Sequence, residues 1–158
     1  METTRRDTPE PRLDPATVTY RGTVYPWHCD HMGHMNVMWY VGKFDEAVWN
    51  LFARLGLTPG YLREHGRGMA ALEQRIEYRR ELHAGDVVAV NSRLTGVREK
   101  VLLVRQTLFD AERGHVAAVM DLVAAQLDTA ARRAVPFPPA IVQRLQAELA
   151  VPHSQPGS

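Results

Sequence analysis

Apolar residues between positions 37 and 55 recur with the period of an α-helix. They are spaced four, three, four, three and four residues apart, at Val37, Val41, Phe44, Val48, Leu51 and Leu55. Such spacing places all of them on one helical face. Asn36 is a suitable N-cap because its side-chain oxygen can accept a hydrogen bond from the first turn, and Gly56 is suited to end the helix. The pattern predicts a long helix over residues 37–55.

One glycine lies inside this predicted helix. At an interior position Gly42 costs about 1 kcal/mol relative to alanine. We therefore expect another part of the structure to pack closely against it.

Most of the remaining chain is rich in β-forming residues or alternates between apolar and polar positions. A first strand is predicted to end at Pro26, and a short amphipathic helix over about 140–149 follows a proline-rich stretch. Connections of hairpin length between successive strands favour an antiparallel sheet. Strands are predicted over residues 17–25, 69–79, 86–95, 100–110 and 115–128.

The strand over 100–110 is apolar on both faces. One face carries Val101, Leu103 and Phe109, and the other carries Leu102, Val104 and Leu108. Such a sheet must be covered on both sides, so we expect the long helix on one face and a partner subunit on the other. The prediction is an α+β fold in which a curved antiparallel sheet wraps around one central helix.

Length and composition describe one ordinary domain. The chain has 158 residues, of which 45% are hydrophobic and 23% charged. We expect a single domain over 16–150, with flexible tails at 1–15 and 151–158.

Charge, hydropathy and cysteine content limit the kinds of partner and the cellular compartment that we expect for this chain. The formal net charge of +1 favours neither nucleic acid nor an anionic membrane as a partner. No signal peptide is visible, and the longest apolar run is interrupted by Asp121 and too short to span a bilayer. A lone Cys29 fits a reducing compartment, so a soluble cytoplasmic protein is expected.

The polar stretch over residues 27–36 contains the chemistry-bearing side chains. Asp30 lies there, just before the unpaired amide groups that open the predicted helix. Those amides and the helix dipole stabilise negative charge, including an oxyanion that forms on a substrate carbonyl. Asp30 is therefore a candidate to attack a carbonyl or to activate water, and a simple capping role is equally compatible with its position.

Two other chemistries compete for the same stretch. His28, Asp30, His31 and His34 are possible zinc ligands, although one short cluster without a distant ligand pair is a weak metal pattern. Cys29 could be a nucleophile with His31 or His34 as its base, or simply a small buried apolar residue.

The motif around Asp30 resembles that of a known family. The run Asp30-His-Met-Gly33-His34-Met-Asn36, followed by Tyr40 and Phe44-Asp45, is similar to the hotdog-fold acyl-CoA thioesterases of the 4-hydroxybenzoyl-CoA thioesterase type. Ile76-Glu-Tyr78 and Gly85-Asp86, which we expect to start successive strands, match the family too. The resemblance covers about residues 17–130 and implies a hotdog fold that hydrolyses acyl-CoA to a free acid and CoA.

The resemblance also implies roles for individual residues. Asp30 falls on the catalytic carboxylate, as nucleophile or general base, and the amide near Val37 falls on the oxyanion hole. His34 and Asn36 would orient substrate or water, and Gly33 and Tyr40 would contact substrate, although Tyr40 could equally be a core residue. One family subgroup has a His or Tyr where this chain has Val37 and Met38. Asp45 or Glu46 is the fallback carboxylate, from the branch whose acid lies on the helix.

A thioesterase of this kind must bind the phosphates of coenzyme A. Candidate cations are Arg98 and Lys100 in one turn, and Arg79 with Arg80 at the end of the preceding strand. Each is also compatible with a solvated surface position. The resemblance implies a homodimer or homotetramer. We expect no cofactor and no metal. An acyl pocket could be shaped by Trp27, Met32, Met35, Met38 and Trp39.

Two other functions remain compatible with the sequence. One is a hotdog hydratase or dehydratase acting on enoyl thioesters, with His34 moving the proton. The other is a non-catalytic protein that binds acyl-CoA. The acyl group itself is not identified by the sequence.

Overall fold

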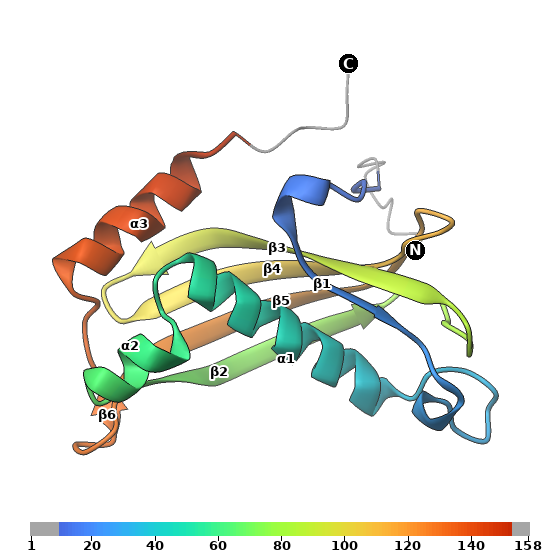
Figure 1. Ribbon diagram of the computed structural model, residues 1–158, viewed down its shortest axis with the longest axis horizontal. Coiled ribbons are helices and arrows are strands. Elements are labelled where there is room, and N and C mark those ends of the chain that lie inside the picture. The colour runs from blue at the N-terminus through green and yellow to red at the C-terminus, as the bar shows by residue number, and fades with distance from the viewer. Residues whose placement is uncertain (1–9, 153–158) are drawn as a thin grey trace, which may run out of the picture.

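The computed structural model describes residues 10–152 and consists of one long helix packed against a curled antiparallel sheet (Figure 1). The sheet order is β1-β3-β4-β5-β2, and β6 pairs with β5. The strands are β1 (Val18–Thr23), β2 (Arg67–Tyr78), β3 (Val87–Arg98), β4 (Val101–Asp110), β5 (Val116–Asp128) and β6 (Arg133–Ala134). The helices are α1 (Val37–Arg54), α2 (Pro59–Glu64) and α3 (Pro139–Ala150), with 3-10 turns at Pro15–Thr17 and Pro26–His28.

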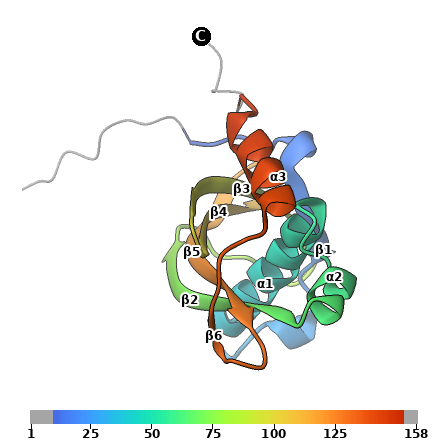
Figure 2. The ribbon, with the colours of Figure 1, turned by 90° about the vertical axis from the view of Figure 1, so that its left-hand side faces the viewer.

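The predicted α+β hotdog architecture is confirmed. Strands β3, β4 and β5 follow one another as antiparallel neighbours, and the β3–β4 and β4–β5 connections are short turns. Viewed from the end, the sheet curls around α1 (Figure 2). Its concave face and the helix share one hydrophobic core.

Helix α1 begins and ends as its sequence predicts. Asn36 is the N-cap and accepts a hydrogen bond from the Met38 amide, and Gly56 adopts a φ of 89° just beyond the last turn. The buried face carries Phe44, Leu51 and Phe52 but not Val37, which is exposed. The apolar stripe therefore enters the core only after the first turn.

Two local expectations are wrong. Gly42 is exposed, and a Cβ placed there would meet no atom within 4 Å, so no described part of the chain packs closely against it. Ile76-Glu77-Tyr78 ends strand β2 rather than starting a strand, whereas Gly85-Asp86 does lie directly before β3. Helix α2, which is only six residues long, was not predicted.

The second face of the sheet is covered in part by the chain's own N-terminal segment. Leu13 packs against a small cluster of Phe109, Val116 and Val119. Asp14 is fixed by Asn91, whose Oδ1 accepts from the Asp14 amide at 3.0 Å and whose Nδ2 donates to the Asp14 carbonyl at 2.6 Å. Residues 1–9 and 153–158, part of the predicted flexible tails, lie outside the described residues.

The length and hydropathy of the helices bear on whether any of them could span a membrane. Among residues 10–152, none of them combines the length and apolar character needed to cross a bilayer.

Candidate active site at the start of helix α1

The loop between β1 and α1 is held in a defined shape by its own backbone. Cys29 and Met35 form an isolated antiparallel bridge, and the turn between them places Gly33 at a φ of 84°. Glycine adopts that conformation without steric cost. The loop is anchored to the β2–β3 connection, because the Met35 amide donates to the Leu82 carbonyl at 2.7 Å.

The Asp30 carboxylate is fixed within this loop through both of its oxygens. Oδ1 accepts from the Met32 amide at 2.8 Å, and Oδ2 accepts from Asn36 Nδ2 at 2.8 Å. The Asn36 hydrogen bond, followed by the Met32 amide, holds the pKa of Asp30 below its ordinary value. Asp30 is therefore ionised at neutral pH, as a nucleophile or general base must be.

Asn36 connects this carboxylate to the first turn of α1. Its Oδ1 accepts from the Met38 amide at 3.0 Å, and its carbonyl accepts from the Trp39 amide at 3.0 Å. Among the described residues nothing accepts a hydrogen bond from the Val37 amide. Asn36 therefore positions the anionic Asp30 carboxylate beside the start of the helix, where the Val37 amide is free to donate. A carboxylate together with a free amide is what an enzyme needs to attack a carbonyl and stabilise the oxyanion that forms.

His34 lies on the side of the loop that faces the β2–β3 connection. Its Nε2 is 3.3 Å from Glu81 Oε1, and its ring lies edge-on to the ring of His83 at 6.4 Å. The structure therefore gives His34 an acidic partner that the sequence analysis did not identify. Glu81 belongs to no motif that the sequence shows, so only the folded chain reveals this contact.

Tyr40 and the two arginines after β2 have structural contacts. Tyr40 is buried in the core, donates from its hydroxyl to the Arg80 carbonyl at 3.3 Å and packs edge-on against Tyr78. Arg79 pairs with Glu77 at 3.1 Å, while Arg80 contacts Glu10 and the Val116 carbonyl. These three residues lie at the same end of the sheet as Asp30.

Arg98 and Lys100 lie at the other end of the sheet. They flank the turn between β3 and β4, whereas the Asp30 loop adjoins the start of β3 (Figure 1). Strand β3 alone has 12 residues, a length of about 40 Å in extended backbone. Within one chain, therefore, the structure does not bring these two cations to Asp30.

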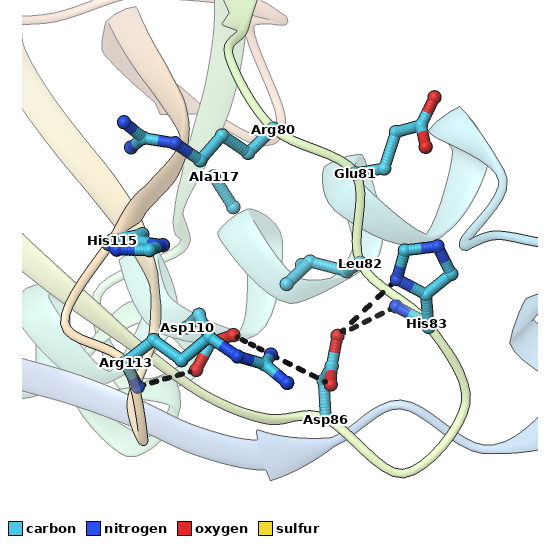
Figure 3. Close-up of a pocket in the computed structure, with 9 residues that line it drawn as sticks. All are labelled: Arg80, Glu81, Leu82, His83, Asp86, Asp110, Arg113, His115 and Ala117. Carbon is cyan, nitrogen blue, oxygen red and sulfur yellow. Dashed lines mark hydrogen bonds and ion pairs between the residues drawn. The ribbon is translucent and has the colours of Figure 1, made fainter.

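A polar depression of about 300 Å³ opens beside Glu81 (Figure 3). Arg113 links two carboxylates of its lining, because its Nη1 lies 2.7 Å from Asp110 Oδ2 and 3.4 Å from Asp86 Oδ1. Burial raises the pKa of Asp110, but its hydrogen bonds from Arg113 outweigh burial and lower it overall. The lining residues are Arg80, Glu81, Leu82, His83, Asp86, Asp110, Arg113, His115 and Ala117. Asp30 is not among them, so within one chain its carboxylate is not enclosed by this depression.

Four rings at the beginning of the loop and in the first turn of α1 form a continuous cluster, which we call the aromatic cluster: Tyr25, Trp27, His28 and Trp39. Tyr25 and Trp27 stack with ring centres 4.4 Å apart and an interplanar angle of 5°. His28 lies 4.5 Å from Trp39 and 5.8 Å from Trp27. The two tryptophans are candidate pocket residues from the sequence, but no pattern in the sequence predicts that the rings meet.

His28 is a neutral member of this cluster. Its Nδ1 accepts from the Tyr25 amide at 3.0 Å, which leaves the proton on Nε2. Burial, and then the charge of Lys43, lower the pKa of His28. Lys43 itself is buried and donates from Nζ to the Tyr20 hydroxyl at 3.1 Å and to the Thr23 carbonyl at 3.4 Å.

The competing chemistries of the loop find little support. Within residues 10–152, no three His, Cys, Asp or Glu side chains are grouped so that they could hold a metal ion. The Cys29 thiol lies 3.9 Å from the Tyr25 carbonyl and packs against the core. That position matches a small apolar residue better than an activated nucleophile.

Comparisons with known proteins agree with the fold. A family model described as the thioesterase-like superfamily matches residues 24–145, which include the Asp30 loop and every strand from β2 to β6.

Two curated relatives have related names. The L-carnitine dehydrogenase/betainyl-CoA thioesterase of Agrobacterium fabrum is 30% identical over 116 residues, which cover 73% of this chain and 24% of the relative. This chain thus spans about a quarter of that protein's length. The betainyl-CoA thioesterase of Pseudomonas aeruginosa is 27% identical over 129 residues, which cover 82% of this chain and 81% of the relative.

Solved structures show the same fold. A hypothetical protein from Staphylococcus aureus in complex with CoA superposes with a TM-score of 0.77 at 22% identity, covering 89% of this chain and 92% of the other. A thioesterase from Thermus thermophilus, complexed with coenzyme A and zinc, superposes with a TM-score of 0.72 at 25% identity, covering 87% and 97%.

Proposed function

This chain belongs to the thioesterase-like superfamily, and we propose that it hydrolyses an acyl-CoA thioester with Asp30 as its catalytic carboxylate. The observation that carries the proposal is the arrangement made by Asn36. Asn36 Nδ2 donates to Asp30 Oδ2 at 2.8 Å, and Asn36 Oδ1 caps helix α1 by accepting from the Met38 amide. The first amide of that helix, at Val37, has no acceptor among the described residues. The names of the curated relatives and the coenzyme A bound to the similar Thermus thermophilus thioesterase support the same reaction class.

The proposed chemistry uses two groups of this chain. The thioester carbonyl oxygen accepts a hydrogen bond from the Val37 amide, so the charge that forms on it in the transition state is stabilised. Asp30 either attacks the carbonyl carbon, giving a mixed anhydride that water then cleaves, or removes a proton from the attacking water. Both routes break the carbon–sulfur bond, release CoA as its thiol and leave a free carboxylic acid.

We further propose that the active unit is a homodimer formed through strand β2. One edge of β2 pairs with β5, while its other edge pairs with no described strand, although β2 has 12 residues. A long unpaired edge favours pairing with another chain. Two copies that pair β2 to β2 in antiparallel fashion satisfy both edges with a single two-fold axis.

This dimer suggests where the phosphates of CoA bind. Antiparallel pairing reverses the partner's sheet, so the partner's β3–β4 turn lies at the same end as Asp30 of the first chain. Arg98 and Lys100 of that turn are then proposed to bind the phosphates across the subunit boundary. Arg79 and Arg80 remain candidates within one chain, although both already contact carboxylates.

The decisive test replaces Asp30 with asparagine, a side chain of nearly the same shape without the charge. We expect Asp30→Asn to lower kcat for thiol release by about a thousandfold or more, because it removes the nucleophile or base. A panel of acyl-CoA thioesters that includes betainyl-CoA is the substrate set, and Glu112→Gln, an exposed carboxylate in the β4–β5 turn, is the matched control.

The outcomes separate the competing functions. Unchanged thiol release by a folded Asp30→Asn variant would contradict the assignment of Asp30. Loss of enoyl absorbance without thiol release in the parent protein would instead identify a hydratase, and binding without either reaction would identify an acyl-CoA-binding protein.

The dimer has its own test. We expect the chain to form a dimer or a multiple of dimers in solution. Leu72, on the exposed part of β2, provides a variant: Leu72→Lys should weaken the association because like charges would then meet across the paired edges. Light scattering over a concentration series measures both. A parent chain that stays monomeric at every concentration would contradict this arrangement.

A further inference from the structure

The aromatic cluster is exposed in a way that folding alone does not explain. Trp27 is 66% exposed and Tyr25 is 47% exposed, yet the two rings lie parallel in contact. Burying such rings stabilises a protein by removing apolar area from water, so their exposure on a preformed surface is typical of a binding site.

The cluster is continuous with the candidate active site. The His28 carbonyl accepts from the Asn36 amide at 2.9 Å, and Asn36 is the residue that holds Asp30. Trp39, which contacts the His28 ring, lies two positions after the free amide of Val37. A small group close to a bound carbonyl would therefore lie near these rings.

The electrostatics of the cluster favour a positive group. The faces of aromatic rings carry partial negative charge and attract cations. His28 is neutral and Asp30 is anionic, while the ammonium of Lys43, whose charge is felt at His28, is buried and donates to the Tyr20 hydroxyl and the Thr23 carbonyl rather than facing the rings of Tyr25 and Trp27. Tyr25 and Trp27 carry no charge of their own.

We propose that the aromatic cluster is the acyl subsite and that it selects acyl groups carrying a quaternary ammonium one methylene away from the thioester carbonyl. This inference rests on the proposed thioesterase function. A quaternary ammonium has no N–H and cannot donate a hydrogen bond, so aromatic ring faces are suited to recognise it. A short spacer keeps the charge near the carbonyl, in keeping with rings that adjoin the Asp30 loop through the hydrogen bond from the Asn36 amide to the His28 carbonyl.

The test compares two thioesters that differ only in charge. Betainyl-CoA carries a trimethylammonium, whereas tert-butylacetyl-CoA has the same shape with a neutral carbon in place of nitrogen. We expect kcat/KM for thiol release to be at least about tenfold higher for betainyl-CoA. Trp27→Leu should reduce this ratio to near one, because it removes the ring face that distinguishes the charged acyl group from the neutral one. Trp27→Phe should keep most of the preference, because it retains a ring.

A ring pair at the opposite end of the sheet provides the control. Tyr61 of α2 stacks on His65, the C-cap of the same helix, with ring centres 4.3 Å apart. Tyr61→Leu should therefore leave the ratio of kcat/KM for the two thioesters unchanged. Equal or better hydrolysis of the neutral thioester by the parent chain would overturn this inference alone, as would a ratio that survives Trp27→Leu. Thiol release from neither thioester nor from any other acyl-CoA would overturn the proposed function together with the inference.

Discussion

The two ends of helix α1 are built from similar apolar residues but serve opposite purposes. At its start Val37 is 55% exposed and Met38 is 62% exposed. In its last turns Leu51, Phe52 and the C-cap Leu55 are buried in the main core, which also includes residues of α3. The difference shows that the C-terminal half of the helix holds the fold together, while its first turn is left accessible beside Asp30.

The largest effect should come from the buried end. Leu51→Ala removes a fully buried side chain, and we expect the free energy of unfolding to fall by about 2–5 kcal/mol from lost burial and the cavity left behind. Chemical denaturation measures this change. Thiol release per folded molecule should stay close to that of the parent chain. A large loss of kcat without loss of stability would contradict the assignment of this end of α1 to stability alone.

A smaller, mixed effect is expected where the two roles meet. Asn36→Ala removes both the cap on the Met38 amide and the hydrogen bond to Asp30. Loss of the cap should cost about 1 kcal/mol of stability, and loss of the hydrogen bond should lower kcat by about ten- to a hundredfold. Parallel denaturation and thiol-release assays separate the two contributions. A variant that loses only stability would show that Asn36 does not position the carboxylate.

The smallest effect concerns pH. The pKa of Asp30 is lowered first by Asn36 and then by the Met32 amide, so the ionised form persists below the usual range of an aspartate, about pH 4. We expect kcat/KM to remain constant down to that range and to fall only at lower pH. The same shift stabilises the folded chain above the pKa of the unfolded carboxyl, and this contribution is lost as the pH falls through the lower, folded value.

The Asn36→Ala variant sharpens this prediction. Because it removes the largest cause of the shift, the acid limb of its pH–rate profile should move to higher pH. A profile that is identical in both proteins would mean that another group sets the limb.

The backbone architecture could be predicted from the sequence to a large extent. The helix over 37–55 and the four strands after it follow from periodicity, and each is found within a few residues of its expected bounds. The failures were local. Helix α2 has too few residues for a visible period, and Gly42 was assigned a packing partner although the structure leaves it open.

The candidate site was predictable only in its centre. Asp30 and Asn36 lie close in sequence, so their hydrogen bond belongs to one loop and one helix start. Glu81 is far from His34 in sequence, and the contact between them depends on how the β2–β3 connection passes the loop. No local pattern encodes such a contact.

By itself the sequence determined the central helix, its cap, the strand pattern and the single loop that carries Asp30. These features depend on interactions between residues a few positions apart, whose geometry is set by the period of the element. Only the tertiary structure decided that Trp39 of α1 meets the rings of the preceding loop and that Arg98 and Lys100 lie at the far end of the sheet from Asp30. Both depend on how distant segments pack, and the free energy that decides packing comes from the whole core rather than from any one segment.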